Sequence, residues 1–138
     1  MDSGEQTHRV ANVLFAFARM ADEGTIEELG ALCTEDVEWQ MAGRTWRGRQ
    51  EVIAGLLSMR AAGHAGPDSG NRHVVTNQEI EVHGGDATAR SYFQLVSVDA
   101  PAKIAAFGAY RDLLRRTAGD HWLIARREVL TPTYEENR

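Results

Sequence analysis

The second half of the chain is a succession of four long strands, and this run constrains the fold more than any other feature. Alternating apolar and polar residues indicate strands at about 72–82, 87–98, 103–116 and 121–130. Short turns containing Gly, Asp or Pro separate them, as in hairpin connections. Consecutive strands of this length twist and coil. We therefore expect a strongly curved antiparallel sheet.

The first half of the chain is mainly helical and contains one short hairpin. Apolar residues recur at the spacing of a one-sided helix, and Thr25 with Glu28 forms a capping box that begins a second helix. Gly24 suits the end of the first helix. The expected elements are helices over 6–22, from Thr25 to Leu32 and over 49–62, with strands at 37–41 and 45–48.

This order predicts a single α+β domain over residues 1–138, with an ordered core at about 6–130. Three N-terminal helices against the concave side of the sheet would close a cone with an apolar pocket at its mouth. The segment from Ala61 to Asn71 is rich in Gly, Ala and polar residues and is expected to be a mobile loop. The tail after Pro132 is expected to fray.

Charge and composition exclude several classes of partner. The net charge is −5, so a clustered basic surface for nucleic acid or an anionic membrane is not expected. No apolar run approaches the ~20 residues of a membrane span, and the polar start is unlike a signal peptide. The single cysteine, Cys33, fits a reducing compartment, and we expect a cytoplasmic protein. Cys33 itself is expected to be a buried structural thiol on a helix.

Asp22 and His73 are the residues that most suggest chemistry. Asp22 falls in the last turn of the first helix, where a carboxylate opposes the helix dipole at a cost of about 0.3–1 kcal/mol. His73 lies near the start of a long strand. A carboxylate that holds an imidazole can move protons near neutral pH. Strict alternation would place His73 on the more polar strand face, whereas a β-bulge would change that phase, so its direction stays open.

The element order, together with three segments, resembles the SnoaL-like branch of the nuclear transport factor 2 superfamily. These segments are Thr34–Trp39, Arg72–Asn77 and Trp122–Arg127. The resemblance covers about residues 6–130 and implies a cone-shaped α+β barrel. The fold hosts many functions, so the resemblance says far more about fold than about activity.

Within this branch, the pattern is closest to scytalone dehydratase and hexachlorocyclohexane dehydrochlorinase. The resemblance implies that Asp22, seventeen residues before Trp39, and His73, three residues before Thr76, are the catalytic pair. An arginine four residues after the last-strand tryptophan corresponds to Arg126. The chain departs from those enzymes at two positions. Phe17 replaces a lysine of the dehydrochlorinase, and Ala21 replaces a tyrosine of the dehydratase.

Six further residues are candidates for substrate binding. Tyr110 and Asp112 share one strand face and could hydrogen-bond a substrate, or form an edge-facing polar stripe. Arg126 shares a predicted face with Trp122 and could bind an oxyanion, or pair with a neighbouring carboxylate. The apolar candidates, which could equally be core residues, are Trp39, Phe17 and Phe93.

These observations favour a cofactor-independent lyase of the dehydratase type, or a related cyclase or isomerase. His73 would remove a proton, Asp22 would hold its tautomer, and the substrate would be a small hydrophobic molecule, such as a polyketide-like or aromatic compound. One alternative is an epoxide-opening cyclase or hydrolase that uses Asp112 and Arg126. Another is a non-catalytic ligand-binding or dimerisation module. No histidine has metal-ligand spacing, and the resemblance implies a homodimer.

Overall fold

The computed structural model describes residues 3–132, and the tail expected to fray lies outside this range from residue 133 onward. The described residues form three helices and six strands in one continuous order. The elements are α1 (Ser3–Glu23), α2 (Ile26–Gly30), β1 (Cys33–Met41), β2 (Arg44–Arg47), α3 (Arg49–Ala61), β3 (Arg72–His83), β4 (Asp86–Ser97), β5 (Lys103–Thr117) and β6 (His121–Leu130).

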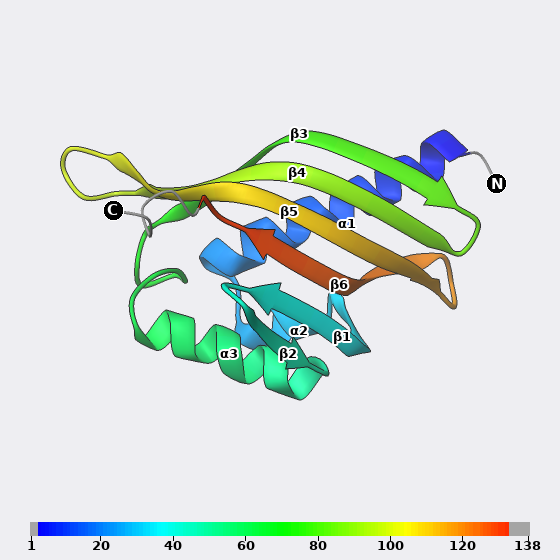
Figure 1. Cartoon of the computed structure of the whole chain (residues 1–138), viewed down its shortest axis with the longest axis horizontal. Coiled ribbons are helices and arrows are strands. Elements are labelled where there is room, and N and C mark those ends of the chain that lie inside the picture. The colour runs from blue at the N-terminus through cyan, green and yellow to red at the C-terminus, as the bar shows by residue number, and fades with distance from the viewer. Residues whose placement is uncertain (1–2, 133–138) are drawn as a thin grey trace.

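One six-stranded sheet, in the order β2-β1-β6-β5-β4-β3, is the framework of the molecule (Figure 1). The predicted α+β class, with a curved sheet against N-terminal helices, is confirmed. The sheet is mixed, however, because β1 pairs parallel to β6, whereas every other pair of neighbouring strands in the sheet is antiparallel. Sequence order did not predict this pairing, because β1 and β6 are separated by most of the chain.

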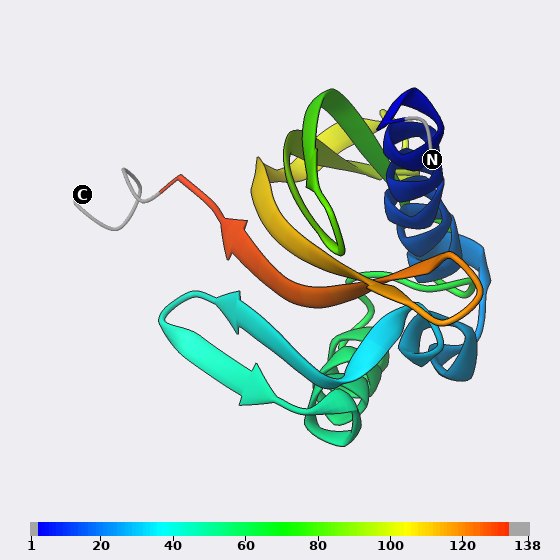
Figure 2. The same ribbon diagram turned by 90° about the vertical axis from the view of Figure 1, so that its right-hand side faces the viewer.

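The helices cover the concave side of the sheet. α1 runs alongside β3, and α3 lies across the β1–β2 hairpin at the other end (Figure 2). Val10, Leu14 and Phe17 project from one stripe of α1 into the core, as its apolar spacing predicts. The predicted capping box is present, with Thr25 and Glu28 each satisfying the other's backbone N–H.

Of the four register shifts in the described strands, two decide which candidate side chains face the interior. In β3 the register shifts between Thr76 and Glu79, where Asn77 adopts a φ of 54°. His73 therefore faces inward before the bulge, and Ile80 faces inward after it, as the burial pattern shows. The bulge that the sequence left open is thus present. In β6 the second bulge lies at Ala125, between the rungs Leu113–Arg126 and Leu114–Ile124.

Cys33 corrects one local prediction. α2 ends at Gly30, and the chain is already extended at Cys33, the first residue of β1 rather than part of a helix. Its thiol is buried and contacts the Leu29 carbonyl at 3.7 Å. Burial raises the pKa of this thiol to about 11, and the nearby Arg127 charge offsets only part of that rise. Cys33 is thus a buried, protonated thiol in the core.

Candidate functional site: a histidine–aspartate pair in a cavity

Asp22 and His73 meet although 51 positions separate them in the chain. The His73 Nδ1 atom lies 2.8 Å from Asp22 Oδ1. The His73 backbone N–H also donates to the carboxylate, at 3.0 Å and 3.1 Å from its two oxygens. Both side chains are mostly buried, His73 with 16% and Asp22 with 8% of its surface exposed. The end of α1 and the start of β3 therefore hold the two groups in one fixed arrangement.

The direction of this hydrogen bond fixes what the imidazole can do. An ionised carboxylate only accepts hydrogen bonds, so Nδ1 of a neutral His73 carries the proton. Nε2 is then left with its lone pair and can accept a proton. The Asp22 charge stabilises the imidazolium that forms, which is the usual function of a carboxylate behind a catalytic histidine. An imidazole held in this way has the chemistry that a general base requires.

His73 lines a cavity of about 470 Å³ inside the cone, a volume typical of small-molecule sites. The cavity is bounded by α1, α3, the loop that follows α3, and the inner face of the sheet. Four aromatic side chains line it beside a larger number of aliphatic ones: Phe17, Trp39, Phe93 and Tyr110. Polar groups gather toward the loop and the β4–β5 hairpin: His64, Asn71, Asp99 and Lys103. The space suits a small and largely apolar molecule.

A second buried pair, Asp112 with Arg127, lies between neighbouring strands. Arg127 Nε and Nη2 donate to the two Asp112 oxygens at 2.7 Å and 3.1 Å, a bidentate arrangement. The Asp112 side chain is fully buried, and only 4% of the Arg127 side chain is exposed. Burial alone would lower the pKa of Arg127, but the Asp112 carboxylate raises it overall, so the guanidinium stays charged. Of the two, only Arg127 lines the cavity.

Aromatic rings surround the Arg127 guanidinium. Its central carbon lies 3.8 Å from the Tyr110 ring centroid and 5.1 Å from that of Phe17. Such contacts can each contribute about 2 kcal/mol when the cation is desolvated. Phe93 in turn stacks on the Tyr110 ring, with the two ring centroids 4.5 Å apart. Burial raises the pKa of the Tyr110 hydroxyl, so this group remains a neutral donor. The cavity thus has a cation and a hydroxyl on its sheet wall.

Arg126 was placed on the wrong strand face by simple alternation. The extra residue at Ala125 shifts the phase of β6, so Trp122 and Ile124 face inward but Arg126 does not. Arg126 is exposed on the outer face, where it reaches Gln40 at 3.4 Å. Arg127 faces the cavity in its place. The arginine doublet could have signalled this, because adjacent residues of a regular strand point to opposite faces, so one of the two arginines faces inward in either phase.

The other predicted substrate-binding residues lie in the cavity wall with one exception. Phe17, Trp39, Phe93 and Tyr110 all line it and all are buried. Phe17 and Trp39 also contact each other, with ring centroids 5.4 Å apart, so they belong to the core as well. Asp112 does not line the cavity, because Arg127 covers it from that side. Sequence reasoning missed Arg127 and also Arg60, whose contacts only the folded chain reveals.

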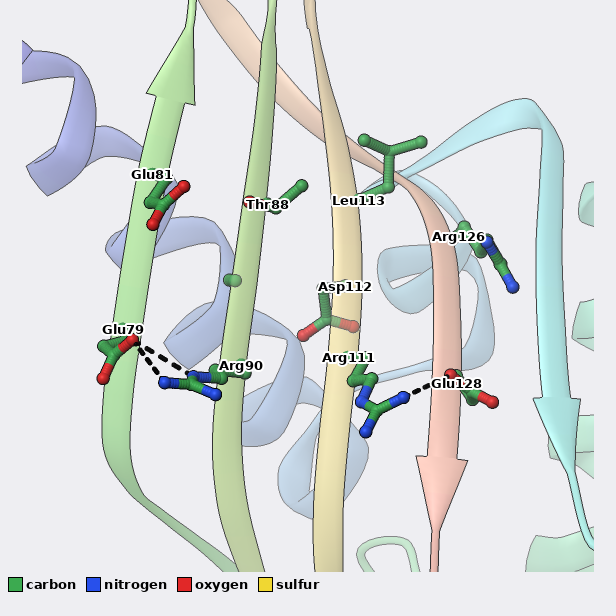
Figure 3. A pocket seen from close by; sticks show the side chains of 10 residues that line it. Glu79, Glu81, Thr88, Arg90, Arg111, Asp112, Leu113, Arg126 and Glu128 are labelled. Atoms are coloured by element: carbon green, nitrogen blue, oxygen red, sulfur yellow. Dashed lines mark hydrogen bonds and ion pairs between the residues drawn. The ribbon is translucent and has the colours of Figure 1, made fainter.

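A larger hollow, of about 730 Å³, lies on the outer face of the sheet, and neither Asp22 nor His73 lines it (Figure 3). Its charged side chains bind one another across the strands. Glu79 pairs with Arg90 at 2.9 Å, and Arg111 lies 3.9 Å from Glu128. These groups are largely exposed, and surface pairs of this kind are worth little. Of the residues that line the hollow, Asp112 is buried, but both of its carboxylate oxygens already accept hydrogen bonds from Arg127.

Residues 3–132 contain neither a cluster of metal-ligand side chains nor a membrane-spanning helix. In that part of the chain, no three His, Cys, Asp or Glu side chains are grouped so that they could hold a metal ion. None of the described helices is long and apolar enough to cross a membrane.

Solved structures with the same fold include an NTF2-like protein with a cystatin-like fold from Novosphingobium aromaticivorans. It is 27% identical, with a TM-score of 0.80 over 92% of this chain and 82% of that chain. A proposed scytalone dehydratase from the same organism is 21% identical, with a TM-score of 0.74 over 92% and 84%. A proposed dehydratase of the NTF2-like family from Streptomyces avermitilis is 17% identical, with a TM-score of 0.78 over 95% and 99%.

Sequence comparison gives the family directly. No curated protein matches the chain by sequence. The profile of the SnoaL-like domain matches residues 3–128, which is nearly all of the chain. This match agrees with the resemblance carried by the segments Thr34–Trp39, Arg72–Asn77 and Trp122–Arg127 and with the folds of the solved structures. The protein belongs to the SnoaL-like family of the NTF2-like superfamily.

Proposed function

We propose that this protein is a cofactor-independent acid–base lyase, of the dehydratase type or a related cyclase or isomerase. The observation that carries the proposal is the 2.8 Å contact between His73 Nδ1 and Asp22, made by a histidine that lines an apolar cavity. A neutral imidazole with a fixed tautomer is suited to remove a proton from carbon. Positioned acid–base groups of this kind contribute about 10²–10⁴-fold to rates.

In a dehydration, His73 Nε2 takes a proton from the carbon next to a carbonyl group of the substrate. The electron pair of that C–H bond forms the new double bond, and the bond to the neighbouring hydroxyl breaks. The leaving oxygen takes the proton from the imidazolium and departs as water. The reaction converts an alcohol into an alkene and water, so His73 returns to its starting state without an external oxidant or reductant.

Arg127 and Tyr110 are suited to bind the substrate oxygen that gains negative charge. A cation and a hydroxyl placed in a dry cavity stabilise an oxyanion strongly. Because Asp112 already compensates the Arg127 charge, the site favours a neutral molecule with a carbonyl or phenolic oxygen over a free carboxylate. The four aromatic wall residues favour a ring. The proposed substrate is therefore a small oxygenated ring compound, which includes polyketide-like and aromatic molecules.

Two structural neighbours are themselves proposed dehydratases, and one of them is proposed to act on scytalone. Their low identity makes them support for the reaction class only. The alternative that relies on Asp112 and Arg126 has less support, because Arg127 covers Asp112 and Arg126 points outward. A non-catalytic ligand-binding module remains the other alternative, and the experiment below separates it from a lyase.

The decisive experiment uses a nitro-substituted benzisoxazole as the probe, because a base alone opens this ring. Removal of its ring C–H proton breaks the N–O bond and releases a coloured nitrile phenolate. We expect the native protein to catalyse this elimination, and His73→Ala to lower the rate by about 10²-fold or more. Loss of the base explains this fall, and absorbance measures it.

Arg127→Gln should also slow the elimination, because the developing phenolate loses its cation. Arg126→Gln is the matched control, since it removes an adjacent arginine from the outer face and should leave the rate unchanged. Circular dichroism must show that each variant is folded. If His73→Ala and the native protein open the ring at the same rate, His73 is no base and the ligand-binding module is favoured.

The outer sheet face is our proposed surface for a homodimer. Four large apolar side chains are exposed there or on its border: Val74, Tyr92, Ile104 and Phe107. These side chains belong to the neighbouring strands β3, β4 and β5. Val74 of β3 and Phe107 of β5 both pair with Gln94 of β4, which lies between them. The charged hollow beside them carries both signs, as a self-complementary surface requires. Phe107→Glu should convert a dimer into a monomer in light scattering, and a monomeric native protein would refute the proposal.

A further inference from the structure

The last turn of α1 carries an unusual concentration of negative charge. Asp22 and Glu23 both lie there, and the turn contains no basic residue. The unpaired carbonyl groups at a helix C-terminus add about half a negative charge. Glu23 pairs with Arg19 one turn earlier, at 3.7 Å, so the charge of an ionised Asp22 and the carbonyl end of the helix are what remain to be offset.

Arg60, near the end of α3, supplies a counter-charge. Its Nη1 atom donates to the Gly24 carbonyl at 2.7 Å. Its Nη2 atom donates to the carbonyls of Met20 at 2.9 Å and Ala21 at 3.2 Å. These three carbonyls lie on both sides of Asp22 in the sequence. A planar guanidinium can serve several acceptors at once in a fixed fork, which a single ammonium group cannot do.

The same side chain supports the segment that leads to His73. Gly66, in the loop after α3, packs so closely on Arg60 that a Cβ there would lie 3.0 Å from its Cδ and Nε atoms. The loop continues through Ser69, which bonds the Gly66 carbonyl, and Asn71, whose N–H donates to the Ser69 hydroxyl. Two residues later the chain reaches His73. Arg60 thus contacts the helix end that carries Asp22 and the loop that leads to His73.

We propose that Arg60 is the positioning residue of the Asp22–His73 pair. Its fork holds the end of α1 so that the Asp22 carboxylate meets the imidazole, and its charge offsets the negative helix end. Arg60 also lines the cavity, but both of its terminal nitrogens are bonded to backbone carbonyls of the α1 end, so we assign its effect on the pair to the placing of Asp22. This inference rests on the proposed role of the pair, but it predicts the geometry of the pair whether or not the protein is a catalyst.

The test is nuclear magnetic resonance of protein labelled with ¹⁵N-histidine, without substrate. In the native protein we expect a downfield Nδ1–H resonance from His73, slow to exchange because Asp22 holds the proton. Its loss in Asp22→Asn assigns it. Arg60→Gln should lose this resonance. Arg49→Gln is the matched control, because Arg49 also lies on α3 and donates to one carbonyl, that of Cys33, at 2.6 Å.

Arg49→Gln should lower the melting temperature as Arg60→Gln does, yet keep the His73 resonance. An unchanged resonance in Arg60→Gln, or its equal loss in both variants, overturns the proposal. If Arg60→Gln does not fold, Arg60→Lys retains the charge without the fork and should exchange the proton faster. A folded Arg60→Lys variant with native exchange would equally overturn it. Ring-opening assays report on His73 as a base separately, so the two proposals fail by different measurements.

Discussion

The protein contains two buried pairs of a carboxylate and a nitrogen-containing side chain, and the two pairs differ in whether the nitrogen group can change its charge. Asp112 and Arg127 come from adjacent strands, form two hydrogen bonds and exclude water almost completely. Asp22 and His73 join a helix end to a strand start, and His73 keeps part of its surface open to the cavity. The guanidinium is always charged, whereas an imidazole changes charge near neutral pH. Only the second pair can exchange a proton during a reaction.

The comparison predicts that the strand pair matters most for stability. Asp112→Asn leaves the Arg127 charge buried without a partner, which typically costs about 3–5 kcal/mol. We expect the free energy of unfolding to fall by that amount, as measured by urea denaturation. Glu79→Gln is the control, because it breaks an exposed pair with Arg90 and should have a far smaller effect. Equal effects of the two substitutions would mean that the buried pair is no structural element.

The helix–strand pair should show the opposite balance, with a large effect on proton transfer and a smaller one on stability. Asp22→Asn keeps an acceptor of the same shape but removes the charge that stabilises an imidazolium. We expect ring opening of the benzisoxazole probe to slow by about 10²-fold, with a smaller loss of unfolding free energy than Asp112→Asn.

Asp86→Asn is the control for this prediction, since Asp86 is an exposed carboxylate at the start of β4 and is not among the residues that line the cavity. Its rate should match that of the native protein. The double variant Asp22→Asn with His73→Ala should be no slower than His73→Ala alone, because the two residues act as one unit. If Asp22→Asn leaves the rate unchanged, the two pairs do not differ in the way proposed.

The sequence predicted the elements well because their signals are local. Hydrophobic period, the Thr25–Glu28 capping box and the hairpin turns each involve residues within a few positions of one another. The meeting of Asp22 and His73 came from a resemblance instead, since nothing local relates a helix end to a strand 51 positions away. The two side chains are in contact in the structure, because the fold brings the end of α1 next to the start of β3.

The features that the sequence did not predict depend on how distant strands pair with one another. The parallel pairing of β1 with β6 and the bulge at Ala125 depend on partners that are distant in the sequence. Because of one extra residue in β6, Arg126 faces outward and Arg127 faces the cavity, whereas simple alternation predicts the reverse. Arg60 was missed for a related reason. Its partners are backbone carbonyls, which every residue has, so no side-chain pattern marks them.

Cys33 provides the smallest and most sensitive test of the comparison, because it lies within the electrostatic field of Asp112 and Arg127. Burial raises its pKa to about 11, so the reactive thiolate is almost absent at pH 8 and increases only as the pH approaches that value. We expect iodoacetamide to label native protein very slowly, as followed by mass spectrometry. Labelling should be faster in Asp112→Asn, whose core opens more often, than in Asp22→Asn. Equal labelling of the two variants would show that the strand pair does not hold the core closed.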